Sequence, residues 1–224
     1  MAGPSVLGVI LAGGLSRRMG GGDKGLLRLA GRTLLDHVAA RLAPQCAAGL
    51  ALNANGDPAR FAGWTSAIVP DPLPGHPGPL AGVLAGLDHA ARHHPGVAHV
   101  VTVSGDAPFL PGDLVARLLV AGMAESRPIA VAASGGRRHH TCALWSVTLR
   151  DDLRAALVER DERRVGRFID RHGAAVAAWP TDPVDPFLNL NTPDDLAAAE
   201  AIHARAEAIH ARAEAIHARV ARGA

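Results

Sequence analysis

The stretch Ser5-Val-Leu-Gly-Val-Ile-Leu-Ala-Gly-Gly-Leu-Ser-Arg-Arg-Met-Gly-Gly-Gly-Asp-Lys-Gly25 joins an apolar run to a glycine-rich loop that holds two arginines and a lysine. A short apolar run of this kind is typical of a buried strand. In open α/β sheets, the loop at the carboxyl end of the first strand is where a nucleotide binds. The stretch therefore predicts an α/β fold with an anion-binding loop at residues 11–25.

Two common phosphate-binding loops do not match this stretch. In a Walker A loop, Gly-Lys is followed by Ser or Thr, whereas Lys24 lies between Asp23 and Gly25. The dinucleotide fingerprint G-x-G-x-x-G needs its second glycine two residues after the first, whereas Gly13 and Gly14 are adjacent. Residues 11–25 therefore belong to neither class of loop.

The chemistry of the loop nevertheless fits a polyphosphate. Adjacent glycines let backbone N–H groups face an anion, because no Cβ stands in the way. Arg17, Arg18 and Lys24 add positive charge on forked or mobile side chains. The alternative is a solvated glycine-rich turn, but motifs farther along the chain favour the nucleotide loop.

Length and composition indicate a single globular domain. The 224 residues can bury a full core, and 48% of them are hydrophobic. The formal charge is only +2 and no long basic block is present, so nucleic acid is not an expected partner. Cys46 and Cys142 lack disulfide or metal-ligand spacing. Because the sequence shows neither a membrane-spanning apolar run nor a secretory leader, we expect no membrane partner and a cytoplasmic location.

Strand and helix patterns alternate along the chain. This alternation predicts a Rossmann-like α/β fold, with an open, mostly parallel sheet and helices on both faces. β-Branched apolar runs mark the strands, and apolar residues at helical spacing mark the helices. The expected strands are 6–11, 49–53, 66–69, 98–104, 129–133, 142–145 and 174–179, and the expected helices are 33–42, 79–92, 112–122, 148–159 and 165–171.

Two aspartates come directly after expected strands. Asp71 follows the strand at 66–69, and Asp106 follows the strand at 98–104. The carboxyl ends of parallel strands meet at one edge of a sheet, so we expect both near the glycine-rich loop. A carboxylate beside a polyphosphate repels it unless a cation intervenes, and Mg²⁺ binds carboxylates together with phosphate oxygens. We therefore expect Mg²⁺ as cofactor and Asp106 as its ligand. The alternatives are a turn or helix-cap role for Asp106 and orientation of the proline-rich loop by Asp71.

Four motifs follow one another along the chain: LAGGLSRRMGGGDKG at 11–25, PGPLAG at 77–82, SGDAP at 104–108 and FLNLNTP at 187–193. Together they resemble the molybdenum cofactor guanylyltransferase family, within the nucleotidyltransferase superfamily. The resemblance covers about residues 5 to 200 and implies a fold like that of the nucleotide-diphospho-sugar transferases. The family shows L-A-G-G where related cytidylyltransferases show L-A-A-G, so the resemblance favours guanine.

The resemblance implies a role for individual residues. Lys24 and Arg18 match the phosphate-binding lysine and arginine of the family, and Asp106 matches its magnesium ligand, so these three are the catalytic candidates. Asn189 and Asn191 match two asparagines beside the pterin substrate. The nucleotide-binding candidates are Leu11, Ala12, Gly13, Gly14, Lys24, Asn53, Asp71 and Asp106, with Asn53 on the guanine side.

The pterin side of the sequence is less regular than the nucleotide side. Where the family often has His-Pro, this chain has His139 and His140, which we expect in a turn. Residues 180–186 (PTDPVDP) predict a rigid loop that leads to the asparagines. Within that loop, Asp182 and Asp185 are expected to be solvated.

The implied reaction transfers GMP from GTP to the terminal phosphate of the molybdenum-molybdopterin cofactor, giving the guanine dinucleotide cofactor and pyrophosphate. The attacking phosphate is ionised at pH 7, so no general base is required. One alternative is a related nucleotidyltransferase that uses CTP or a sugar phosphate, and another is a non-catalytic nucleotide-binding adaptor for cofactor delivery. We also expect transient contacts with other cofactor-biosynthesis proteins and with receiving molybdoenzymes.

The C-terminal residues 199–219 are three exact copies of Ala-Glu-Ala-Ile-His-Ala-Arg. Their alanines and isoleucines recur at alternating spacings of three and four, which predicts a helix with a narrow apolar stripe. We therefore place the nucleotidyltransferase domain at 1–198 and a heptad-repeat helical extension at 199–224. A solvated extension is favoured over pairing with another chain, because alanine buries little apolar surface.

Overall fold

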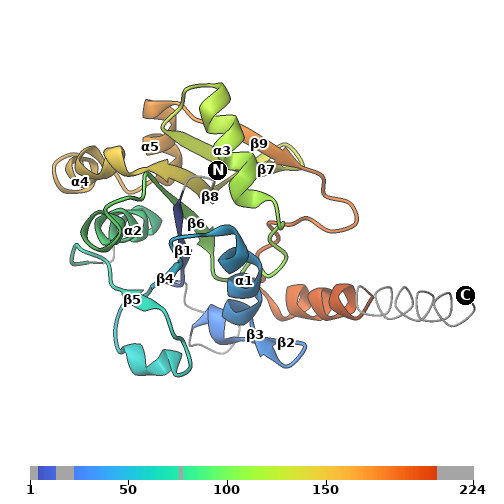
Figure 1. Ribbon diagram of the computed structural model, residues 1–224. Coiled ribbons are helices and arrows are strands. Elements are labelled where there is room, and N and C mark those ends of the chain that lie inside the picture. The colour runs from blue at the N-terminus through green and yellow to red at the C-terminus, as the bar shows by residue number, and fades with distance from the viewer. Residues whose placement is uncertain (1–4, 14–22, 76–77, 206–224) are drawn as a thin grey trace, which may run out of the picture.

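The computed structural model describes residues 5–13, 23–75 and 78–205. At its centre is a seven-stranded sheet in the order β5-β4-β1-β6-β8-β7-β9 (Figure 1). Neighbouring strands are parallel except at β8, which is antiparallel to both β6 and β7. The strands are β1 (Val6–Leu11), β4 (Leu50–Asn53), β5 (Ala67–Val69), β6 (His99–Ser104), β7 (Ile129–Ser134), β8 (Arg137–Ser146) and β9 (Ala175–Trp179).

Helices cover both faces of the sheet (Figure 1). On one face, α1 (Leu34–Leu42) and α3 (Leu114–Ala124) pack in a core cluster with the sheet residues Ile10 and Val103. On the other face, α2 (Pro79–His93), α4 (Arg150–Val158) and α5 (Val165–His172) pack in a second cluster around Trp145, which is fully buried. Strands buried on both faces read as continuous apolar runs, which is why the sequence pattern located them. The predicted α/β fold with a mostly parallel sheet is confirmed.

The direction of the strands brings several chain segments to one edge. Because β6 and β7 are each antiparallel to β8, they run the same way, and β1 and β4 run parallel to β6. The carboxyl ends of these four strands are Leu11, Asn53, Ser104 and Ser134. We call this side of the sheet the carboxyl edge, and open α/β sheets bind their ligands there.

Two regions differ from the sequence prediction. β8 begins at Arg137, so His139 and His140 belong to a strand and the expected turn is wrong. Its polar first half carries no apolar signal, and only the second half was predicted. A two-stranded hairpin, β2 (Arg28–Leu29) and β3 (Arg32–Thr33), was also missed. Its turn residues Ala30 and Gly31 both have positive φ, 48° and 78°, as a type I′ hairpin turn requires.

A capping box starts α1. The Thr33 hydroxyl accepts a 3.1 Å hydrogen bond from Asp36 N, and the Asp36 carboxylate accepts a 3.0 Å bond from Thr33 N. These two bonds satisfy N–H groups that lack a partner within the helix. The hydrogen bond from the Thr33 side chain holds the pKa of Asp36 below its ordinary value, even though partial burial opposes it. The Thr-x-x-Asp spacing therefore fixes where the helix begins, next to the hairpin.

The described chain ends in a helix over residues 193–205, which crosses the predicted boundary between residues 198 and 199 without a break. Ala199 is fully buried with Leu29 and Leu34, and Glu200 Oε1 accepts a 2.9 Å hydrogen bond from Ala30 N. The first residues of the heptad segment are thus docked on the β2–β3 hairpin. The division of the chain at this point stays a prediction, and residues 206–224 lie outside the described ranges.

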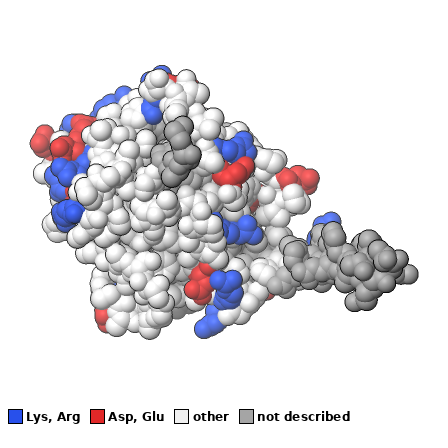
Figure 2. Space-filling view, viewed as in Figure 1, with Lys and Arg blue, Asp and Glu red and all other residues white. Residues whose placement is uncertain are grey.

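On the face shown in Figure 2, charged side chains lie mostly near the margins, with basic and acidic groups beside one another and a broad uncharged area between them. Around α4, for example, Arg150 pairs with Asp151 at 3.0 Å and Arg160 pairs with Asp152 at 2.8 Å. Within the described ranges, no helix combines the length and the apolar character needed to cross a membrane.

Candidate active site

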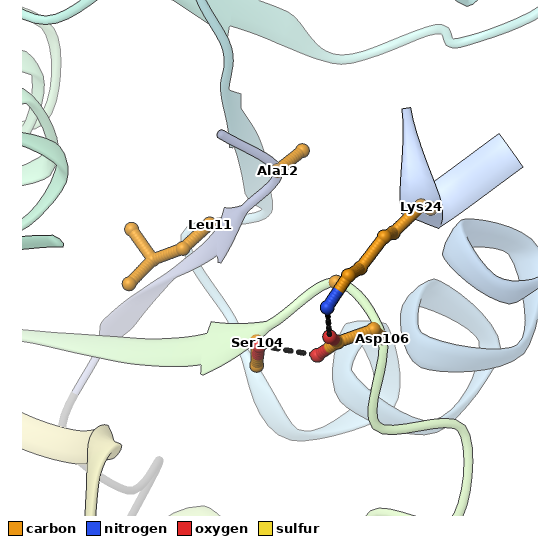
Figure 3. Close-up of a pocket in the computed structure, with 7 residues that line it drawn as sticks. Leu11, Ala12, Lys24, Ser104 and Asp106 are labelled. Atoms are coloured by element: carbon orange, nitrogen blue, oxygen red, sulfur yellow. Dashed lines mark hydrogen bonds and ion pairs between the residues drawn. The ribbon is translucent and has the colours of Figure 1, made fainter. Parts of the chain in front are cut away.

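A small open pocket lies at the carboxyl edge of the sheet, where the ends of β1 and β6 meet the segment that follows the glycine-rich loop (Figure 3). Ala12 N donates to Asn53 O at 2.9 Å, and Gly105 N donates to Leu11 O at 3.0 Å. These bonds continue the ladder past the strand ends and hold three segments together. The pocket is lined by Leu11, Ala12, Lys24, Gly25, Ser104, Gly105 and Asp106.

A charged pair lies in this pocket. Lys24 Nζ is 3.5 Å from Asp106 Oδ2, and the two side chains are 20% and 12% exposed. Ser104 Oγ donates a 2.6 Å hydrogen bond to the other carboxylate oxygen, Asp106 Oδ1. Figure 3 shows the ammonium and the hydroxyl approaching the carboxylate from different sides. The Asp106 carboxylate is therefore held at one oxygen by Ser104, while its other oxygen faces the lysine.

Close backbone packing sets the position of Lys24. The lysine opens the short helix η2 (Lys24–Leu26), in which Leu27 N donates to Lys24 O at 3.1 Å. A Cβ added at Gly25 would lie 2.7 Å from Leu35 Cγ, so only glycine lets this turn pack against α1. The preceding residue, Asp23, pairs with Arg60 at 2.6 Å. These contacts fix both neighbours of the lysine.

The segment that holds Asn189 and Asn191, here called the asparagine segment, reaches the same pocket from the other end of the chain. Leu190 N donates a 3.0 Å hydrogen bond to Asp106 O, and Asn191 Oδ1 accepts a short hydrogen bond from Lys24 Nζ. Asn191 Nδ2 donates to Asn189 O at 3.2 Å. Lys24 thus connects the glycine-rich loop, the metal candidate Asp106 and the asparagine segment.

A second capping box fixes Asn191. Asp195 Oδ2 accepts hydrogen bonds from Asn191 N at 2.8 Å and Thr192 N at 2.9 Å, while Asp195 N donates to the Thr192 hydroxyl at 3.1 Å. The backbone N–H of Asn191 is the main reason that the pKa of Asp195 lies below its ordinary value, and the Thr192 side chain adds to the effect. The negative charge of Asp195 therefore helps to hold the asparagine segment at the start of the last helix.

A second polar cluster lies at the ends of β4 and β5. Asp71 Oδ1 accepts from Asn53 Nδ2 at 3.0 Å, and Asp71 Oδ2 accepts from Asn55 Nδ2 at 2.7 Å. Asp71 N in turn donates to Asn55 Oδ1 at 2.8 Å. A Cβ added at Gly82 would lie 2.3 Å from Asn53 Oδ1 and 2.8 Å from Leu11 Cδ2. The first turn of α2 therefore closes against Asn53 and Leu11, and both carboxylate oxygens of Asp71 are oriented by amides.

The structure brings most of the predicted site residues into these two groups. Leu11, Ala12, Lys24 and Asp106 line the pocket with Asn191 beside them, whereas Asn53 and Asp71 form the second cluster. Asn189 contributes its backbone carbonyl. Gly13 is exposed at the edge, and Gly14 and Arg18 lie outside the described residues.

Sequence reasoning missed two supporting residues and misplaced a third. Ser104 lies two residues before Asp106, and Asn55 lies two residues after Asn53. This spacing could have indicated that the two members of each pair lie at the end of the same strand. Asp182 is exposed as predicted, whereas Asp185 is half-buried and hydrogen-bonded within the protein. Asp185 Oδ1 accepts hydrogen bonds from Ser134 Oγ and Phe187 N. The nearby prolines at 183 and 186 predicted an exposed loop and gave no sign of the long-range contact with Ser134.

The donor atoms suit a hard cation that is shared with a phosphorylated ligand. Within the described ranges, no three His, Cys, Asp or Glu side chains are placed to enclose a metal ion. Mg²⁺ needs no such cage, because it is commonly held by one or two carboxylates plus phosphate oxygens. The oxygens of Asp106 fit that pattern.

Comparison with known proteins agrees with this geometry. Residues 8–176 match the model of the MobA-like NTP transferase domain. The chain is 58% identical over 200 residues to a molybdenum cofactor guanylyltransferase of Bradyrhizobium sp. (strain ORS 278), covering 89% of this chain and 94% of that protein. It is 55% identical over 202 residues to the protein of that name from Rhodopseudomonas palustris (strain BisB5), covering 90% and 96%.

A solved structure has the same fold. The crystal structure of molybdopterin-guanine dinucleotide biosynthesis protein A from Archaeoglobus fulgidus superimposes with a TM-score of 0.69 at 22% identity, covering 89% of this chain and 99% of that one. The family match begins inside β1 and ends inside β9. It therefore includes both polar clusters at the carboxyl edge but not the asparagine segment. The chain belongs to the family of MobA-like NTP transferase domains.

Proposed function

We propose that this chain transfers GMP from GTP to the terminal phosphate of the molybdenum-molybdopterin cofactor. The products are the molybdopterin guanine dinucleotide cofactor and pyrophosphate. Relatives that share 58% and 55% of its residues over nearly their whole length carry the name of this activity. The structural observation that carries the proposal is the contact of Lys24 with both Asp106 and Asn191, because it joins the nucleotide loop to the segment that the resemblance assigns to the pterin.

The reaction joins two anions, so charge is its main obstacle. An oxygen of the pterin phosphate attacks the α-phosphorus of GTP, and the bond from that phosphorus to the bridging oxygen of pyrophosphate breaks. The attacking phosphate monoester is largely ionised at pH 7, so no residue has to remove a proton from it. The site must instead position two phosphorylated molecules and stabilise the charge that shifts to the leaving pyrophosphate.

Lys24 is placed for the electrostatic part of this task. Its side chain is four-fifths buried and its ammonium is held between Asp106 and Asn191, so little reorganisation is needed when phosphates arrive. Asp106, fixed by Ser104, is the residue that would hold Mg²⁺. When bound, Mg²⁺ would neutralise phosphate charge at this carboxylate.

We assign the cluster of Asn53, Asn55 and Asp71 to binding of the nucleotide base. Guanine presents adjacent N–H donors, and an ionised carboxylate can accept two parallel hydrogen bonds. Amides already orient both Asp71 oxygens, so the direction of their remaining lone pairs is set before a ligand binds. Leu11 and Ala12 line the adjacent pocket.

The decisive experiment is incubation of the full chain with GTP, Mg²⁺ and molybdenum-loaded molybdopterin, followed by mass analysis of the products. We expect the guanine dinucleotide and one pyrophosphate for each molecule formed. A parallel panel with CTP, ATP and UTP tests the base. Asp151→Asn provides a control variant, because Asp151 is an exposed residue on α4 that pairs with Arg150.

Two outcomes would replace the proposal. Efficient transfer from CTP, with little from GTP, would assign the chain to a sister nucleotidyltransferase activity. Tight GTP binding that needs no Mg²⁺ and leads to no product with any nucleotide would indicate the cofactor-delivery adaptor. Transfer restricted to GTP and dependent on Mg²⁺ would support the guanylyltransferase.

A further inference from the structure

A third polar cluster lies at the carboxyl edge, beyond the pocket. Ser134 is the last residue of β7, and its Oγ is 2.7 Å from His139 Nε2 on β8. The same Oγ donates a 2.8 Å hydrogen bond to Asp185 Oδ1 in the loop after β9. We call Ser134, His139 and Asp185 the anchor cluster. It joins two strands to the loop that leads into the asparagine segment.

The hydrogen-bond pattern of the anchor cluster excludes a serine nucleophile. In a catalytic triad the histidine takes the serine proton and the carboxylate bonds to the histidine. Here the serine proton points to Asp185, so His139 is the donor to Ser134 through Nε2–H. Ser134 is also only 3% exposed. The cluster is therefore built to hold its members in place.

Asp185 also holds the residues that follow it in place through hydrogen bonds. Its Oδ1 also accepts a 3.0 Å hydrogen bond from Phe187 N, and its carbonyl accepts a 3.2 Å bond from Leu188 N. The Phe187 ring is 2% exposed and lies 4.7 Å from the His139 ring and 5.3 Å from Trp179, measured between centroids. Residues 185–188 are thus fixed to β7, β8 and β9 by both polar and aromatic contacts.

The next attachment follows at Leu190, whose N–H is bonded to Asp106 O and whose side chain is fully buried. Asn189 lies between the two attachments. Among the described residues its half-buried side chain has no hydrogen-bond partner, whereas Asn191 is held by Lys24 and Asp195. The position of the Asn189 amide therefore depends on the attachments at Asp185 and Leu190.

We propose that the anchor cluster positions Asn189 for the phosphorylated pterin, so that Ser134, His139 and Asp185 control binding of that substrate without touching it. This inference rests on the proposed guanylyl transfer for its substrate. The GTP half of the site does not depend on the cluster, because Leu11, Ala12, Asn53 and Asp71 are held by β1, β4 and β5.

Asp185→Ala tests the proposal, with Asp185→Asn as the conservative partner. The alanine variant removes the acceptor for Ser134 and Phe187 N, whereas the asparagine variant keeps an acceptor oxygen at the same position. We expect Asp185→Ala to raise the KM for molybdenum-loaded molybdopterin roughly tenfold, as the loss of buried hydrogen bonds to a charged group predicts. GTP affinity, measured by calorimetry with Mg²⁺, should stay within about twofold of wild type in both variants.

Asp182→Asn is the matched control, since Asp182 is an exposed residue of the same loop. It should leave both substrates unaffected. The Asp185→Asn variant should recover most of the pterin affinity that Asp185→Ala loses. An equal loss of GTP binding and pterin binding in Asp185→Ala would indicate general destabilisation and overturn the proposal.

Hydrogen exchange of the free chain tests the anchor independently of turnover. Amides 187–190 should exchange faster in Asp185→Ala than in wild type or Asp182→Asn. Unchanged exchange there would refute the anchor even if the wild type makes the dinucleotide. Absence of product from the wild type would instead refute the proposed reaction and, with it, the assignment of Asn189 to the pterin. The hydrogen-exchange result would still decide whether the anchor cluster holds residues 187–190.

Discussion

Lys24 Nζ lies 3.5 Å from Asp106 Oδ2, and the same ammonium donates to Asn191 Oδ1. The three residues come from the loop after β1, the end of β6 and the segment after β9. Parallel strands bring the first two together at the carboxyl edge, and the backbone bond from Leu190 N to Asp106 O brings in the third. One largely buried lysine therefore contacts both the end of β6 and the segment that holds Asn189 and Asn191.

Removing the Lys24 charge should abolish most turnover and leave the fold intact. Lys24→Met keeps an unbranched stem of similar length but cannot stabilise phosphate charge. We expect kcat/KM to fall by about 10²- to 10³-fold, the usual effect of losing one such group. Pyrophosphate release measures activity, and urea unfolding should match the Asp151→Asn control closely. Activity within about threefold of wild type would remove Lys24 from the catalytic residues.

The Asp106→Asn variant tests the negative charge of this residue, because asparagine has nearly the same shape as aspartate but is neutral. Asparagine can still accept the hydrogen bond of Ser104, so the local structure should persist. The neutral amide is a poor Mg²⁺ ligand, and turnover should fall by about 10²-fold or more. Raising the Mg²⁺ concentration should restore part of the rate. If the Mg²⁺ dependence of the variant matched that of wild type, Asp106 would not be the ligand.

The core of the fold could be predicted from sequence because its strands are apolar on both faces. Val6–Leu11 is a continuous apolar run, and the four inner residues of His99–Ser104 are buried, three of them valines. β8 was only half recognised, since Arg137 to His140 are polar and are exposed or half-buried. The two-residue strands of the β2–β3 hairpin are too short to show any periodicity.

The site was predictable only as far as local motifs reach. Lys24 and Asp106 stand in recognisable motifs at strand ends, and their proximity follows from parallel topology. The bond between Lys24 and Asn191 joins residues that are 167 positions apart, and no local pattern encodes it. The contact of Asp185 with Ser134 is likewise set by how the loop after β9 folds back over β7.

Gly82→Ala should impair nucleotide binding through a steric effect. The new Cβ would lie 2.3 Å from Asn53 Oδ1, and moving Asn53 would break its 3.0 Å bond to Asp71. We expect a loss of about 1–3 kcal/mol in unfolding free energy, as for overpacked sites, and a raised KM for GTP. Gly112→Ala is the control, because a Cβ there meets nothing within 4 Å. Equal behaviour of the two variants would show that α2 can shift away from Asn53.

The two cysteines should be unreactive in the folded protein. Burial raises the pKa of the Cys46 thiol to about 12 and that of the Cys142 thiol to about 11. At pH 8 almost none of either thiol is then ionised, and the thiolate is the reactive form. A chromogenic disulfide reagent should label neither cysteine in the native chain and both in denaturant. Rapid stoichiometric labelling of the native protein would contradict the buried environment.

The Asp195 capping box should make the asparagine segment sensitive to acid. The folded pKa of Asp195 lies below its unfolded value, chiefly because Asn191 N donates to the carboxylate. Its contribution to stability is therefore complete above the unfolded pKa of about 3.9 and is lost as the pH falls through the folded pKa. Asp195→Ala should lower the unfolding free energy at pH 7 by about 0.5–1 kcal/mol, because solvent screens the exposed part of the carboxylate.

Urea unfolding of Asp195→Ala and wild type at pH 7 and near pH 3 measures this difference directly. The two proteins should differ at pH 7 and approach each other in acid, where the wild-type carboxyl becomes protonated. Asp182→Ala, a change at an exposed loop position, should follow wild type at both values. A gap between Asp195→Ala and wild type that stayed constant with pH would mean that lost packing, and not the charge on Asp195, accounts for the effect.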